Sequence, residues 1–446
     1  VANMARNMDA SQFGQLGGAK VAGMAMQMDT TQFAQLGGSG VANMARNMDA
    51  SQFGQLGGDR LAGMAMQMKG DQFGQMGGAK VADMAMNMNA NNFKMMSGDS
   101  LAGMTKNMDA SQFSTLGGNK LAGMAMHMGG NDFGQLGGAK VTDMALTMND
   151  SNFGRMGGAA LGGMAMNMDA SNFGQLGGSK LAGMAMHMRG NDFGQMGGGK
   201  VTDMALNMET SHFAKMGGES VAGMAMHMGA DQFGKLGGDR LMGMAKQMDA
   251  QHFGTMGGGA IAGMAMNMNA SQFAEMGGTK LAGMAMHMGK DQFGDLGAGK
   301  VTDMAMQMNK DQFGTMGGAA LGGMMMQMGN DQFAQMGADK MAGMAMQMRG
   351  NDFGQLGTGK VHDMAKMMGG DQFKEMGGQA IAGMAMHMGA NEFGDLGKGK
   401  VTDMAMNMNP ENFKEMGGAA VTGMAMQMGA AEFGQLGGDR MAGMAM

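Results

Sequence analysis

Methionine and histidine side chains alternate in a short motif that could bind a soft metal. The run Met-Ala-Met-His-Met spans residues 124–128 and places thioethers on both sides of His127. Thioethers are ligands that suit Cu(I). The residues that would carry such sites are Met124, His127, Met128, His187, His227, His287 and His387. Sequestration of copper by a methionine- and histidine-rich array is therefore our alternative hypothesis for the function.

A structural role explains the same residues more simply. Methionine fills the slots of Met124 and Met128 in every complete repeat of the chain, as a helix core requires, whereas the slot of His127 also accepts Asn and Gln. An exposed polar slot accounts for this tolerance. Our main interpretation therefore expects no cofactor and no metal site.

Catalytic patterns are missing from the sequence. No Ser-His-Asp set, paired carboxylate site or phosphate loop can be identified, and the Gly-Gly pairs follow a predicted helix rather than a strand. The chain has no cysteine, which excludes disulfides, zinc fingers and thiol catalysis. Asp9 and the polar residues after it are typical of a helix cap rather than of a calcium site. We expect that the protein is not an enzyme.

The charges argue against two classes of partner. The net charge of -6 comes from 31 basic and 37 acidic residues that are interspersed along the chain. Without a basic tract, nucleic acid is not an expected partner. No run of 18 apolar residues exists, so no membrane span is expected.

A 20-residue repeat organises the whole chain. All 22 phenylalanines fall at position 13 when Val1 is counted as position 1. The consensus is [VLIM]-x-[GDN]-M-A-x-x-M-x-x-x-x-F-x-x-[LM]-G-G-x-[KR], and the stretch 121–140 shows it complete. Such a period is typical of a solenoid, in which each unit buries its apolar side against its neighbours. We expect one continuous array over residues 1–446, a segment of a longer chain or one whose ends partners cover.

Two short helices per repeat are predicted. Apolar residues at positions 1, 4, 5 and 8 form one helical face, so helix A should run from about position 19 to position 8 of the next repeat. Asp, Asn or Gly at position 9 should cap helix B, at about positions 10–17, and Gly-Gly should supply a left-handed stop. Pro410 fits the first turn of a helix B behind Asn409. The expected fold is an all-α solenoid of two-helix repeats that forms a superhelical rod.

A longer period is superimposed on the repeat. Eight repeats lack Lys or Arg at position 20 and end in Gly40, Ser100, Ala160, Ser220, Ala260, Ala320, Ala380 and Ala420. Six of them carry Asp at position 3, where a lysine three residues earlier could form an ion pair, and these lateral-contact candidates are Asp83, Asp143, Asp203, Asp303, Asp363 and Asp403. The spacing suggests a superhelix of about 2.7 repeats per turn that returns these repeats to one side. Duplication of a larger block explains it too, and both interpretations remain open.

Together these patterns predict a non-catalytic structural repeat protein. It would form a fibre or filament by self-association or by packing against another filament or surface protein, outside the cell or at its surface. Exposed methionines at positions 6 and 16 would make adaptable lateral contacts. Besides the copper array, a scaffold that binds a peptide or protein is a third hypothesis.

Overall fold

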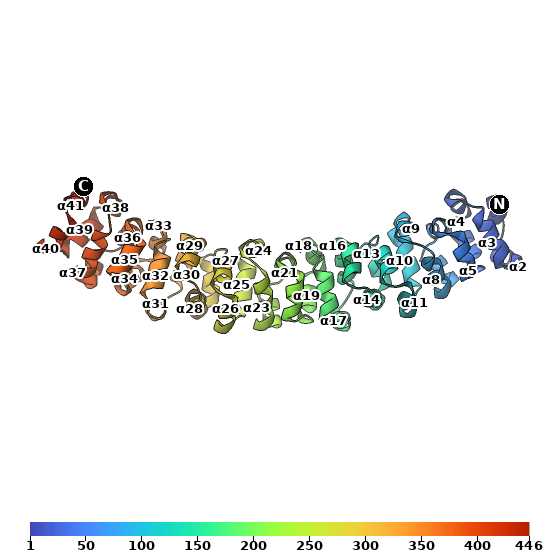
Figure 1. Ribbon diagram of the computed structural model, residues 1–446, viewed down its shortest axis with the longest axis horizontal. Helices are drawn as coiled ribbons and strands as arrows, with labels where there is room; N and C mark the ends of the chain where they lie inside the picture. The colour runs from blue at the N-terminus through green and yellow to red at the C-terminus, as the bar shows by residue number, and fades with distance from the viewer. Residues whose placement is uncertain (446) are drawn as a thin grey trace. The chain divides into compact units, whose positions relative to one another are not determined.

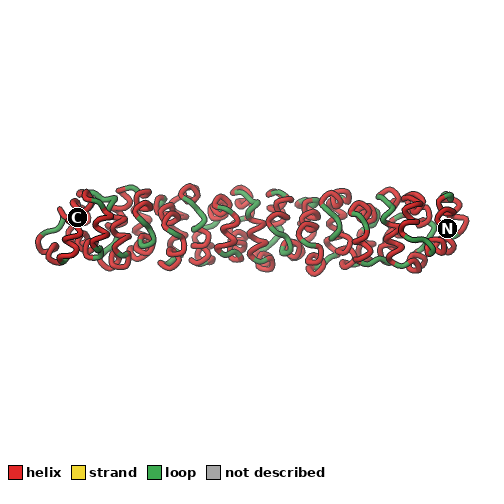
Figure 2. The backbone as a smooth tube through the Cα atoms, turned by 90° about the horizontal axis from the view of Figure 1, so that it is seen from above, coloured by secondary structure: helices red, strands yellow, loops and turns green. Residues whose placement is uncertain are grey.

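The computed structural model describes residues 1–445, and these residues form α-helices and connecting turns without any strand. Two compact units are present, Val1–Met228 and a second that begins at Gly229. Within each unit the helices follow one another in chain order (Figure 1). The helices are joined by short turns (Figure 2). The predicted all-α solenoid of two-helix repeats is confirmed.

The helices of the first unit are α1 (Ala2–Arg6), α2 (Ala10–Leu16), α3 (Gly18–Met26), α4 (Thr30–Arg46), α5 (Ala50–Leu56), α6 (Gly58–Ala65), α7 (Gly70–Met76), α8 (Gly78–Met86), α9 (Ala90–Met95), α10 (Gly98–Lys106), α11 (Ala110–Leu116), α12 (Gly118–Ala125), α13 (Gly130–Leu136), α14 (Gly138–Thr147), α15 (Asp150–Met156), α16 (Gly158–Met166), α17 (Ala170–Ala185), α18 (Gly190–Met196), α19 (Gly198–Leu206), α20 (Thr210–Met216) and α21 (Gly218–Ala225).

The helices of the second unit are α22 (Ala230–Leu236), α23 (Gly238–Gln247), α24 (Ala250–Met256), α25 (Gly258–Met266), α26 (Ala270–Met276), α27 (Gly278–Ala285), α28 (Lys290–Met306), α29 (Lys310–Met316), α30 (Gly318–Met326), α31 (Asn330–Met336), α32 (Ala338–Ala345), α33 (Gly350–Leu356), α34 (Thr358–Met367), α35 (Gly370–Met376), α36 (Gly378–Ala385), α37 (Ala390–Met406), α38 (Pro410–Met416), α39 (Gly418–Met426), α40 (Ala430–Leu436) and α41 (Gly438–Ala445).

Helix A ends earlier than the sequence predicts. It starts at position 18 and in most repeats stops at position 5 or 6, as α12 does at Ala125. The amides of His127 and Met128 bond to the carbonyls three residues before them, which tightens the backbone into a turn. Met128 nevertheless stays buried just beyond the helix, so the apolar pattern is correct although the helix boundary is wrong.

Side-chain caps begin helix B as expected. The Asp9 carboxylate accepts bonds from the amides of Ser11 and Gln12, and the Gln12 side chain accepts from the Asp9 amide. This reciprocal arrangement is a capping box. Asn409 caps α38 in the same way, with Pro410 as its first residue, which confirms that prediction.

The glycine pair serves two purposes, and neither is the predicted left-handed stop. Gly137 has φ 77° and ψ 156°, a conformation open to glycine alone, and it sends the chain directly into the next helix. Gly18 instead leaves room for the neighbouring turn, since a Cβ there would lie 2.6 Å from the Asn47 carbonyl oxygen. In α4, α17, α28 and α37 a position-17 glycine kinks two helices that otherwise run together.

Within each unit a helix packs on the third helix along the chain when the two halves of α4, α17, α28 and α37 are counted separately, so three helices make one superhelical turn. One series of contacts in the first unit joins α6, α9, α12, α15 and the second half of α17, and we call it the first column. A second column joins α8, α11, α14, the first half of α17 and α19, and a third joins α7, α10, α13, α16 and α18. A turn therefore contains one and a half repeats, and the expected 2.7 is wrong. Three repeats make two turns and return to the same column.

The core lies between these columns. Phe133 and Met124 are fully buried, and the same holds for their equivalents along most of the chain. Glycine at position 3 allows the turns to approach closely, because a Cβ on Gly163 would lie 3.1 Å from the Gly130 Cα. Every helix thus depends on neighbours about 30 residues away, as short helices that are marginal alone must.

Candidate functional site

The histidine slot at position 7 connects successive turns. Nε2 of His227 lies 2.6 Å from the Gly190 carbonyl oxygen, and His387 makes the same 2.6 Å contact with Gly350. Asn167 donates its side-chain amide to the corresponding carbonyl of Gly130 at 2.8 Å. Asn and Gln can replace His at position 7 because all three can donate to this carbonyl.

His127 and His187 lie in the first column, two turns apart. Burial, and then the positive charge of Lys94, hold the pKa of His127 below its ordinary value. His187 packs over Gly154, where an added Cβ would lie 3.1 Å from the imidazole ring. His287 contacts the Ala250 carbonyl at 2.8 Å. The histidines are therefore placed as parts of the contacts between turns.

The methionines of the copper motif have different environments. Met124 and Met128 are buried, and Met126 between them is 37% exposed. At each motif the accessible soft donors are then one thioether and one imidazole. Within residues 1–445, no three His, Asp or Glu side chains converge in a group that could hold a metal ion. The copper array remains an untested hypothesis with few accessible donors.

The six predicted lateral-contact aspartates are half-buried, not fully exposed. Asp83, Asp143 and Asp203 lie on α8, α14 and α19, all in the second column. In the second unit, Asp303 lies on α28 and Asp363 lies on α34. Both helices contact α31, so these two aspartates lie in one column. Asp403 lies elsewhere, against Gly370 at the start of α35.

From Lys80 on, the position-20 lysines bond to backbone carbonyls of the preceding turn and do not form the expected ion pair. We call this contact the lysine clip. Lys140 donates to the carbonyls of Lys106 and Met108, the latter at 2.8 Å, across more than 30 residues. Lysines that reach the preceding turn in this way are Lys80, Lys120, Lys140, Lys180, Lys200, Lys280, Lys300, Lys340, Lys360 and Lys400. They bond to the carbonyls at positions 6 and 8, which end helix A, where the helix dipole favours a cation.

This geometry corrects the predicted pairing of Lys200 with Asp203. The Lys200 ammonium donates to the Met166 carbonyl, and the ion pairs of the described residues do not include the Lys200–Asp203 pair. Burial lowers the pKa of Lys140 below its ordinary value of 10.5, and Asp109 and Asp143 oppose that shift. The aspartates thus act on the lysines at longer range.

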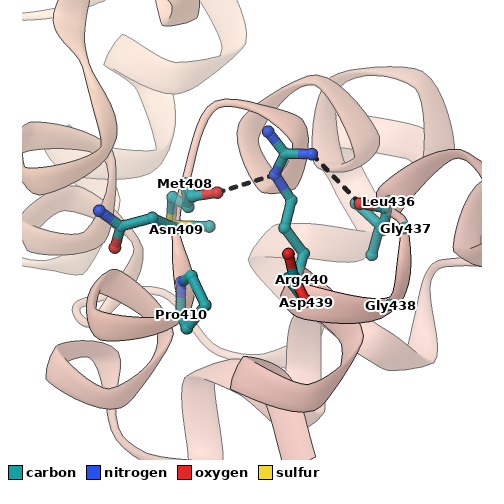
Figure 3. Close-up of a pocket in the computed structure, with 8 residues that line it drawn as sticks. All are labelled: Met408, Asn409, Pro410, Leu436, Gly437, Gly438, Asp439 and Arg440. Carbon is teal, nitrogen blue, oxygen red and sulfur yellow. Dashed lines mark hydrogen bonds between the residues drawn. The ribbon is translucent and has the colours of Figure 1, made fainter.

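Arginine can form the clip as well. Nε of Arg440 donates to the Met408 carbonyl at 2.9 Å, and its guanidinium also donates to the Leu436 carbonyl at 3.1 Å (Figure 3). These groups line a cavity of about 400 Å³ beside Pro410. The position-8 carbonyl therefore accepts cations of different shape.

In repeats without a cation at position 20, the corresponding carbonyls accept a hydrogen bond from a serine hydroxyl or have no donor from the described chain. The Ser100 hydroxyl donates to the Met68 carbonyl at 3.1 Å, and the Ser220 hydroxyl donates to the carbonyls of Met186 and Met188. Where the residue is alanine, as at Ala160 and Ala380, no donor from the described chain reaches the pair. This difference gives the eight unusual repeats a distinct local chemistry.

Exposed methionines at position 6 form a row on the first column. Met66, Met126 and Met186 are each 37% exposed, whereas methionines at positions 4, 8 and 16 are buried in most repeats. The predicted exposure of methionines at position 16 is therefore wrong, because these side chains pack between the turns. The three exposed methionines follow α6, α12 and the second half of α17, which stack through α9 and α15. We call these three residues the methionine row. Their spacing of three repeats brings them back to one side after every two turns.

One histidine stands apart from these patterns. His362 occupies a slot that holds Ala or Thr in most repeats, and its Nε2 is buried without a hydrogen-bond partner. Nε2 lies 3.8 Å from an Asp395 carboxylate oxygen, which in turn lies 3.9 Å from Nζ of Lys366. No partner for His362 can be predicted from the sequence pattern, because these contacts join residues 29 and 33 positions apart.

Comparison with known proteins adds no family. No protein-family model matches the chain, and no curated protein matches it. Among the described residues no helix is both long and apolar enough to cross a membrane.

Proposed function

We propose that the chain is a non-catalytic structural protein that associates laterally with further copies of itself to build a fibre or filament. The observation that carries this proposal is the methionine row of Met66, Met126 and Met186. An apolar row that recurs at a fixed spacing on one column is suited to contact with another molecule. Flexible thioethers adapt to such a contact without demanding one fixed geometry.

A second copy is the partner that the spacing favours. Each copy presents the row with the same interval of three repeats, so two rows can meet in register over several turns. A different partner would have to carry a matching period. Location outside the cell or at its surface, which we also propose, rests on composition alone.

Charged residues beside the row could adjust this contact. In the first unit, Arg189 and Glu219 approach to 3.9 Å with both side chains largely exposed. Such exposed pairs contribute little stability by themselves, and salt weakens them. We therefore expect the apolar row to dominate the association, with a modest dependence on ionic strength.

Replacement of the row tests the proposal. The triple variant Met66→Gln, Met126→Gln, Met186→Gln should keep the helical content of the wild type and lose most of its self-association in sedimentation velocity. The matched control replaces Met26, Met86 and Leu146, the position-6 residues of helices α3, α8 and α14, and should associate as the wild type does. A wild type that stays monomeric at high concentration, or a control that loses association instead, would reject this face.

A further inference from the structure

Five backbone carbonyl pairs in the chain occupy the positions of the lysine clip but have no lysine at position 20. The residue at position 20 is alanine at Ala160, Ala260, Ala320, Ala380 and Ala420. The paired carbonyls, 34 and 32 residues earlier, belong to Met126 and Met128 for Ala160 and to the equivalent methionines for the others. We call these five the open carbonyl pairs.

The clip shows what chemistry such a pair accepts. In the sister repeats, equivalent oxygens accept hydrogen bonds from a lysine ammonium, an arginine guanidinium or a serine hydroxyl. Each pair also ends a helix A, where the helix dipole adds negative potential. An ammonium with several N–H donors can satisfy both oxygens at once.

A cavity that could hold a ligand lies beside one open carbonyl pair, that of Met346 and Met348. Met346, Met348 and Ala380 are among the residues that line this cavity of about 350 Å³. Among the described residues no hydrogen-bond donor reaches these two carbonyls. Arg349 also lines this cavity. Its charge disfavours a second cation, so the Ala160 pair, which has Gly129 in the corresponding place, should bind more tightly.

We propose that the open carbonyl pairs bind a primary ammonium group from outside the chain, in the geometry of the lysine clip. The ammonium could belong to a small alkylamine or to a lysine side chain of a second copy, and the chemistry of recognition is the same. One open pair, that of Met126 and Met128, lies at the methionine row, whereas serine hydroxyls reach the corresponding carbonyls beside Met66 and Met186. The site does not require the self-association proposed above, although a lysine donor would link the two.

Butylammonium is the probe for this site. Binding to the full chain should be saturable in a calorimetric titration, and tetramethylammonium, which carries the same charge but no N–H donor, should bind about tenfold more weakly or not at all. The test variant replaces all five alanines with lysine, which should close the pairs as in the sister repeats. It should fold, raise the melting temperature and lose butylammonium binding.

A matched control separates the pocket from the added charge. Five lysines at exposed position-15 sites, in place of Gln175, Gln195, Gln335, Gln355 and Gln435, add the same charge and should leave butylammonium binding unchanged. Three results would each overturn the proposal. Tetramethylammonium could bind as tightly as butylammonium, the variant with lysine in place of the five alanines could keep its butylammonium binding, or the wild type could show no saturable binding.

Sedimentation distinguishes the two sources of the ammonium. If butylammonium dissociates self-associated chains, a lysine of a second copy is the natural occupant. If butylammonium binds and association persists, the sites take a small amine, and the proposed self-association stands on the methionine row alone. A monomeric wild type that still binds butylammonium would reject the proposed function while keeping this inference.

Discussion

At the scale of single residues, two nearby glycines differ in whether another residue could replace them. Gly197 has φ 79°, whereas Gly199 lies two residues later inside α19 with open space around its Cα. Positive φ is costly for any residue with a Cβ, and a helical glycine in open space is destabilising relative to alanine. The backbone therefore requires glycine at position 197 but not at position 199.

Substitution of these two glycines gives opposite predictions. Gly197→Ala should lower the free energy of unfolding of the first unit by about 1–2 kcal/mol. Gly199→Ala should raise it by about 0.4–1 kcal/mol, because the unfolded chain loses freedom. Urea unfolding followed by circular dichroism measures both. Equal effects of the two changes would show that the conformation at Gly197 is not required.

Residue types alone did not reveal the clip. Lys200 and Asp203 have the spacing of an ion pair on one helix, yet the lysine reaches the carbonyl of Met166 in an earlier helix. That contact depends on which turn lies beside which, a property of the superhelix. The position-7 histidines were similarly interpreted as exposed polar residues, because their carbonyl partners lie 37 residues away.

At the scale of helices, the sequence was a better guide. The caps, the proline at the start of α38 and the buried phenylalanines follow from local pattern, and all are present. Errors were confined to the end of helix A and the conformation of the glycine turn. Both depend on how tightly the chain turns after Met124, which apolar spacing does not specify.

Aspartate caps make helix B sensitive to acid. The Ser111 hydroxyl and then the Gln112 amide lower the pKa of Asp109 below its ordinary value of 3.8, and Asp49 and Asp169 are held in the same way. Because the unfolded chain binds these protons more readily, this stability is complete above pH 3.8 and is lost as the pH falls through the lower folded pKa values.

The chain itself supplies the control for this pH dependence. Asn caps helix B at Asn149 and Asn409 and does not titrate. A variant with Asn at positions 9, 49, 109, 169 and 249 should therefore keep its caps and lose part of the acid destabilisation below pH 3.8. Thermal unfolding across this range compares the two proteins. Identical slopes would mean that the caps contribute nothing to the acid response.

At the scale of the whole molecule, the number of repeats between two residues determines whether they lie on the same column. Each repeat contributes two helices to a turn of three, so the side that a residue occupies depends on how many repeats precede it. The intervals of three repeats in the first unit, seen in Asp83, Asp143 and Asp203, keep equivalent residues in one column. The period was visible in the sequence, but its relation to the turn required the helix contacts.

Two deletions within the first unit test whether placement on one column governs association. Removal of residues 101–160, three repeats, deletes Met126 but leaves Met66 and Met186 on one column. Removal of residues 141–160, one repeat, keeps all three methionines but shifts Met186 to another column. Sedimentation velocity of both proteins is the most direct test of the account. We predict that the three-repeat deletion associates nearly as the wild type does and that the one-repeat deletion associates weakly. The reverse order, or equal association of the two proteins, would contradict it.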